Sequence, residues 1–130
     1  MRATGSFQVQ LTPRSSDSPG EGVPLGQMDI AKSFTGDLAG TSAGTMLAAV
    51  TAVKGSAAYV ALERFSGTLH GRAGTFVLQH RGVMDRGAQS LQIEVVPDSG
   101  TGELAGLSGR FELTIVDGRH DYVLDYALPG

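Results

Sequence analysis

Apolar and polar residues alternate in several segments of the chain, and this period of two restricts the fold more than any other feature. In residues 6–12, Phe7, Val9 and Leu11 alternate with polar residues, so an extended strand places the three apolar side chains on one face. The same period recurs in residues 90–97, 109–118 and 119–128. No segment has a convincing helical period, and the sequence therefore predicts an all-β fold.

Turn residues divide the chain into about eight strands. The 19 glycines and five prolines follow no fixed period, which indicates many turns and bulges, and the Asp-Gly pair at 117–118 is typical of a tight hairpin. Residues 40–53 are ambiguous: Ala, Met and Leu favour a helix, whereas Thr, Val and Gly favour a strand. We expect a strand there, because both neighbouring segments are strands.

Eight strands joined by short turns indicate an antiparallel barrel or sandwich, and we predict a single antiparallel eight-stranded β-barrel over residues 1–130. Closing the barrel removes exposed strand edges, and eight strands enclose an interior wide enough for side chains or one small ligand. Residues 13–26 concentrate Pro, Ser and Gly without an apolar period. We expect them to form a long exposed loop or lid.

Composition excludes several classes of protein. The net charge is −3 and the ten Lys and Arg residues are scattered singly, whereas a nucleic-acid surface clusters basic charge. The absence of cysteine excludes disulfides and thiolate metal sites. No apolar run approaches 18 residues, and the first eleven residues lack the apolar core of a secretory signal. We expect a cytoplasmic protein with no membrane or nucleic-acid partner.

Two motifs do not support a cofactor or metal site. The segment GTGELAG (100–106) resembles a dinucleotide fingerprint, but its last glycine falls one residue late and no helix is expected after it. The three histidines, His70, His80 and His120, lack the spacing of metal ligands. Three unrelated strand histidines are favoured over one metal site, and we predict neither a cofactor nor a metal.

An ionisable side chain is predicted to point into the barrel, because His80 has the same parity as Phe76 and Leu78. If the turn GRAG (71–74) closes a hairpin with residues 57–70, Phe65 lies opposite His80 and Glu63 is its diagonal neighbour on the same face. The predicted wall consists of Tyr59, Ala61, Glu63, Phe65, Leu69, Phe76, Leu78 and His80.

A β-bulge at Gly67 is the alternative for this hairpin. It would turn Glu63 outward and bring Val60, Leu62 and Arg64 to the interior.

Glu63 and His80 are the candidate catalytic residues. Burial disfavours their ionised forms while mutual attraction favours them, so either group can titrate near neutral pH and transfer a proton. Glu63 can alternatively stabilise a cationic transition state. The structural alternatives are a satisfied buried pair, or Glu63 in water at the end of the barrel.

Aromatic and apolar residues of inward parity are the candidate ligand contacts. They are Tyr59, Phe65, Phe76, Leu78, Tyr122 and Tyr126. Inward tyrosines such as Tyr122 and Tyr126 belong to the core more often than to a ligand site. Asp121 and Asp125 alternate with them, and we expect these two side chains on the surface.

Three long segments carry a resemblance to a known family. The segments SFTGDLAGTSAGTML, GSAAYVALERFSGTLHGRAGTFVLQHRG and VVPDSGTGELAGLSGRFELTIVDGRHDYVLDY together resemble the bacterial family named domain of unknown function 3224, over residues 1–129. That family is similar in fold to allene oxide cyclases and dirigent proteins, which are small antiparallel eight-stranded barrels with an apolar cavity. Those proteins steer reactive intermediates without a cofactor and commonly form trimers.

The resemblance implies a barrel that binds a small apolar molecule and forms a homo-oligomer. No catalytic motif of those enzymes matches this chain, so no residue role is carried over, and fold does not determine function. Three functions stay open: a cofactor-free isomerase, cyclase or lyase using Glu63 and His80, a noncatalytic small-molecule carrier, and a structural barrel with a filled interior.

Overall fold

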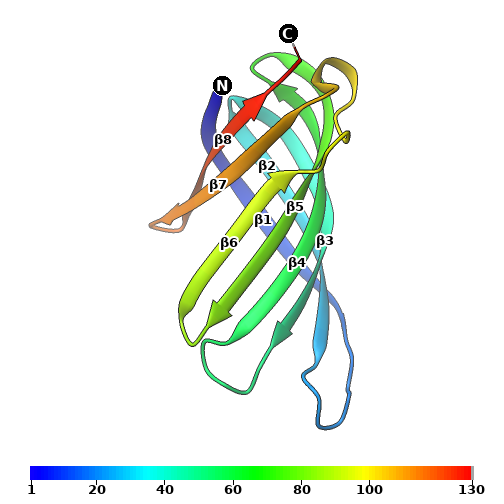
Figure 1. Ribbon diagram of the computed structural model, residues 1–130, viewed down its shortest axis with the longest axis vertical. Coiled ribbons are helices and arrows are strands. Elements are labelled where there is room, and N and C mark those ends of the chain that lie inside the picture. Colours follow the sequence, from blue (N-terminus) through cyan, green and yellow to red (C-terminus); the bar gives the residue numbers. More distant parts are fainter. Residues whose placement is uncertain (130) are drawn as a thin grey trace.

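The computed structural model describes residues 1–129, which form a closed barrel of eight antiparallel strands (Figure 1). Each strand pairs with the next in the chain, and the last returns to pair with the first. The strands are β1 (Arg2–Ser16), β2 (Leu25–Gly36), β3 (Leu38–Val50), β4 (Ala57–Leu69), β5 (Arg72–Asp85), β6 (Ala88–Val95), β7 (Ser108–Val116) and β8 (Arg119–Ala127). The predicted fold class is confirmed.

Helical structure in residues 1–129 is limited to one short 3-10 turn, η1 (Gly102–Leu104). Within this described part, no helix is long and apolar enough to cross a membrane. The ambiguous segment 40–53 is a strand through Val50, as predicted. Its glycines allow close approach to β4: a Cβ on Gly44 would lie 2.1 Å from the Leu62 carbonyl oxygen and 2.6 Å from the Glu63 Cα.

The predicted loop over residues 13–26 is too long. Strand β1 continues to Ser16 and β2 begins at Leu25, so only residues 17–24 lie outside strands. A register shift between Pro13 and Ser15 accommodates the proline, whose missing N–H would otherwise interrupt the ladder. Asp17 closes the hairpin by accepting the Leu25 N–H at 2.7 Å, and this arm projects beyond the barrel (Figure 1).

The predicted β4–β5 register is wrong by four positions. Phe65 lies opposite Phe76, and His80 lies opposite Ala61. The turn consists of two residues, His70 and Gly71, with φ of 48° and 78°, which is shorter than the four-residue turn expected from GRAG. An even offset keeps the same side chains on the inner face.

The bulge alternative at Gly67 is also wrong, because the β4–β5 register is continuous. Val60 and Leu62 are accordingly exposed, at 55% and 56%, and Arg64 is exposed as well.

Aromatic side chains fill the barrel at the end that carries the β2–β3 and β4–β5 turns. They are Phe7, Phe34, Phe65, Phe76, Phe111 and Tyr122. Phe34 packs edge-on against Phe65, with ring centroids 5.5 Å apart, and the Tyr122 hydroxyl accepts the Leu38 N–H at 2.8 Å and donates to the Thr35 carbonyl at 2.9 Å. This half of the barrel is filled by side chains, which leaves the other end for a cavity.

Candidate functional site

A buried carboxylate receives three hydrogen bonds just beyond the aromatic core. Glu63 is 1% exposed, because its strand parity points it inward. Its Oε1 accepts from Lys32 Nζ at 2.7 Å and from His80 Nε2 at 2.5 Å, while its Oε2 accepts from Ser42 Oγ at 2.5 Å. The donors come from β2, β5 and β3, and we refer to these four residues as the Glu63 cluster.

Glu63 is ionised at neutral pH. Burial alone raises the pKa of this carboxyl, but the His80 hydrogen bond and the positive charge of Lys32 outweigh burial and lower the pKa to about 2. An ionised carboxylate can only accept hydrogen bonds, so His80 must carry a proton on Nε2. Glu63 therefore fixes both the orientation and the protonated nitrogen of the imidazole.

The other ring nitrogen of His80, Nδ1, takes no part in the hydrogen bonds of the cluster. In residues 1–129, every fully buried side-chain nitrogen and oxygen has a hydrogen-bond partner. His80 bonds the protein through Nε2 and is 4% exposed, so its Nδ1 is not completely buried. When the ring is neutral, this nitrogen presents a lone pair that can accept a proton.

Lys32 and Ser42 were not predicted as members of the site. In the sequence, Lys32 interrupts the apolar face of residues 28–34, yet it has the same parity as Ile30 and Phe34. It lies inside, at 8% exposure, with its ammonium 4.7 Å from the centroid of the Phe7 ring. A buried ammonium requires an anionic partner, and that requirement, applied to the sequence, would have paired Lys32 with an inward acid. No sequence signal distinguishes Ser42.

An apolar pocket of about 390 Å³ opens at the end of the barrel opposite the aromatic core; we refer to it as the mouth pocket. Its wall includes Met28, Met46, Met84, Tyr59 and Leu91. All methionines of the chain other than Met1 thus line one space. Methionine side chains are flexible and polarisable, so this wall can adapt to ligands of different shapes.

Tyr59 lies between the mouth pocket and the Glu63 cluster. Its ring covers Gly82, where an added Cβ would lie 2.3 Å from the Tyr59 Cε1 atom, and its centroid is 6.4 Å from that of the His80 ring. Burial and the negative charge of Glu63 raise the pKa of Tyr59. The phenol therefore stays protonated at neutral pH and can donate a hydrogen bond.

The structure separates the predicted ligand contacts into two groups. Tyr59 lines the mouth pocket. The other five are packed in the core and lie outside that lining: Phe65, Phe76, Leu78, Tyr122 and Tyr126. Predicted parity correctly placed all six inward, but parity does not distinguish the filled end of a barrel from the open one.

The three histidines lie in separate surroundings. His70 contacts Tyr126 through Nδ1 and Asp37 through Nε2, the latter at 3.3 Å, and His120 lies against Phe7 with ring centroids 5.1 Å apart. Within residues 1–129, no three His, Asp or Glu side chains gather in an arrangement that could hold a metal ion.

Comparisons with known proteins place this geometry in a family. The family model described as "Protein of unknown function (DUF3224)" matches residues 3–126. A DUF3224 protein of unknown function from Shewanella oneidensis MR-1, known from a crystal structure, is 48% identical to this chain in sequence. The two structures superpose with a TM-score of 0.94, over 100% of this chain and 98% of that chain. No curated protein matches the chain. The family match covers nearly the whole barrel, and the chain belongs to the DUF3224 family.

Proposed function

We propose that the protein binds a small, mainly apolar molecule in the mouth pocket and that His80 exchanges a proton with it. The pocket volume of about 390 Å³ falls within the range of small-molecule sites, roughly 300–1,000 Å³. The pocket wall is apolar and includes the Tyr59 phenol, whose ring centroid lies 6.4 Å from that of His80 in the Glu63 cluster. This combination of an apolar wall with a few polar groups is typical of ligand sites.

The roles within the cluster follow from its protonation. Glu63, with a pKa of about 2 and both oxygens occupied, is a positioning residue and not the proton carrier. His80 Nδ1 accepts a proton from an acidic C–H or O–H bond of the ligand, and the Glu63 carboxylate stabilises the imidazolium that forms. Returning that proton to a different ligand atom completes an isomerisation with no net redox change and no cofactor.

The main support for this proposal is the arrangement of Glu63 and His80. The buried, ionised Glu63 accepts a hydrogen bond from His80 Nε2, so Nδ1 stays available to a ligand. A purely structural ion pair between Lys32 and Glu63 does not require a histidine as well. The resemblance to the allene oxide cyclase and dirigent barrels points to the same class of cofactor-free chemistry. Ligand binding alone, with no proton transfer, is the carrier alternative.

Proton transfer can be tested with 2-tetralone, a mainly apolar ketone with acidic C–H bonds. We expect the protein to accelerate exchange of these hydrogens in D₂O, measured by proton NMR, and to bind the ketone in the mouth pocket. His80→Gln should abolish the acceleration while binding is retained, and Glu63→Gln should shift the pH profile of exchange. His120→Gln is the matched control and should behave as the wild type.

Two results would overturn parts of this proposal. Binding without accelerated exchange would exclude proton transfer and leave the carrier function. Absence of chemical-shift changes at the methionine methyl groups, at saturating ketone, would exclude the mouth pocket as the binding site.

A further inference from the structure

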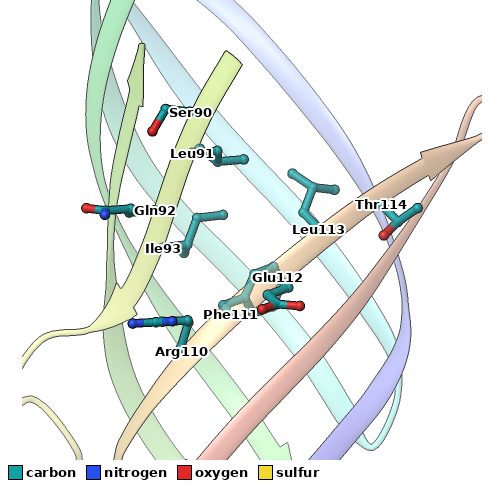
Figure 2. A pocket seen from close by; sticks show the side chains of 9 residues that line it. All are labelled: Ser90, Leu91, Gln92, Ile93, Arg110, Phe111, Glu112, Leu113 and Thr114. Carbon is teal, nitrogen blue, oxygen red and sulfur yellow. The ribbon is translucent and has the colours of Figure 1, made fainter. Parts of the chain in front are cut away.

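Within residues 1–129, the barrel closes between β6 and β7 through a single paired position. This position pairs Glu94 with Arg110, whereas β6 pairs with β5 along its whole length and β7 pairs with β8 along its whole length. The strands diverge from that pair and leave a space of about 470 Å³ lined by side chains of both (Figure 2). We refer to this space as the seam; it adjoins the mouth pocket at Ser90 and Leu91.

Main-chain groups of both strands point into the seam. The Val96 N–H bonds the Val77 carbonyl, and the antiparallel alternation from that pair directs the N–H and C=O groups of Gln89 and Leu91 away from β5. The Tyr126 N–H bonds the Met1 carbonyl, and the same alternation directs those of β7 residues 113 and 115 away from β8. The seam therefore has donors and acceptors on both sides with no strand between them.

Apolar side chains at the seam are left uncovered. Leu91 and Ile115 have the parity of the buried residues Ile93 and Phe111, yet they are 44% and 61% exposed. Residues 88–93 of β6 also contain no charged residue and no proline, which are the usual protection of an exposed strand edge. An unprotected edge beside uncovered apolar residues is suited to receiving another strand.

We propose that the seam accepts an extended segment of a partner polypeptide as an additional strand. Main-chain hydrogen bonds to the edge residues of β6 and β7 would hold the segment, as in other cases of strand addition. Its inward side chains would be apolar and would cover Leu91 and Ile115. Its outward side chains would be polar, because Arg110 and Glu112 flank the seam on the outer face.

No segment within the described residues 1–129 is suited to supply the strand from a second copy of this chain. Each of the eight strands is already paired within its own barrel, and an unpaired segment is needed to enter a gap between two strands. The described loop at the tip of the β1–β2 arm, residues 17–24, contains Pro19, Pro24 and two glycines, so it is a poor strand former. The observations thus favour a segment from a different protein.

The test uses a capped synthetic peptide, acetyl-Lys-Val-Thr-Val-Thr-Val-Lys-amide, and the full-length protein. We expect peptide-dependent NMR shifts and slower hydrogen exchange, by about tenfold or more, at the amides of 89, 91, 113 and 115. The same peptide with N-methyl groups at alternate residues cannot form the ladder and should not bind. Leu91→Lys should weaken binding, whereas Leu62→Lys, on the outer face of β4, should not.

Three outcomes would overturn the proposal: no shift at millimolar peptide, equal binding of the N-methylated peptide, or a peptide-free dimer in which amides 89 and 91 are already protected. The last would assign the seam to a second copy. Because the readout is at the seam amides and the ketone readout is at the methionine methyl groups, failure here is distinguishable from failure of the proposed function.

Discussion

Replacing Glu63 by Gln should make the free energy of unfolding less sensitive to acid, because the loss of stability that comes from protonating Glu63 can no longer occur. The ordinary pKa of a glutamate is 4.5, and the fold lowers that of Glu63 to about 2. At about 1.4 kcal/mol for each pH unit of this interval, ionised Glu63 contributes roughly 3 kcal/mol to the free energy of unfolding. Because the folded-state pKa is depressed, this contribution is complete above pH 4.5 and is lost as the pH falls towards 2.

At neutral pH, the same substitution leaves the Lys32 ammonium buried beside a neutral amide. Removing one partner of a buried ion pair costs about 3–5 kcal/mol, which is a large share of the 5–15 kcal/mol typical of a folded domain. Lys32→Met combined with Glu63→Gln should recover part of that loss, since no uncompensated charge remains.

Urea unfolding followed by circular dichroism between pH 7 and pH 2 measures both effects. The free energy of unfolding of the wild type should fall by roughly 3 kcal/mol more than that of Glu63→Gln between pH 5 and pH 2. The exposed Glu112→Gln, on β7, is the matched control and should follow the wild type. Parallel pH curves for the wild type and Glu63→Gln would show that folding does not lower the pKa of Glu63.

Three further changes test other contacts. Ser42→Ala removes a hydrogen bond to a charged group and should lower the free energy of unfolding by about 1.5–3 kcal/mol, measured by urea titration; no loss would show that the contact is absent in solution. Gly82→Ala should displace the Tyr59 ring, so the Tyr59 ring proton shifts in NMR should change, and unchanged shifts would contradict the packing. The hydrogen bond from the Thr4 N–H lowers the pKa of Asp37. The carboxyl ¹³C signal of Asp37 should therefore titrate with a midpoint below 3.8. A midpoint at or above that value would argue against this hydrogen bond.

Strand parity predicted most of the fold and the orientation of the site residues. The alternation around His80 is independent of which residues face each other across the hairpin, so Glu63 and His80 are both inside although the predicted register was wrong by four positions. The register depends on the conformation of the His70–Gly71 turn. A histidine with positive φ is uncommon, and local sequence did not reveal it.

The composition of the Glu63 cluster was harder to predict than its orientation. Lys32 and Ser42 reach Glu63 from β2 and β3, and these contacts depend on the closure of the barrel and not on a local motif. The division of the interior into a filled end and an open end likewise follows from side-chain volume summed over eight strands. Tyr126 could not be separated from Tyr59 by period alone for this reason.

The protonation state of His80 shows whether Glu63 positions the imidazole for proton transfer. In the neutral ring, Nε2 should carry the proton and donate to Glu63, while Nδ1 should be unprotonated and should change its ¹⁵N shift when a ligand binds in the mouth pocket. A long-range ¹H–¹⁵N NMR spectrum of the imidazoles reports both nitrogens. A neutral His80 with its proton on Nδ1 would contradict the proposed role of this nitrogen as the proton acceptor.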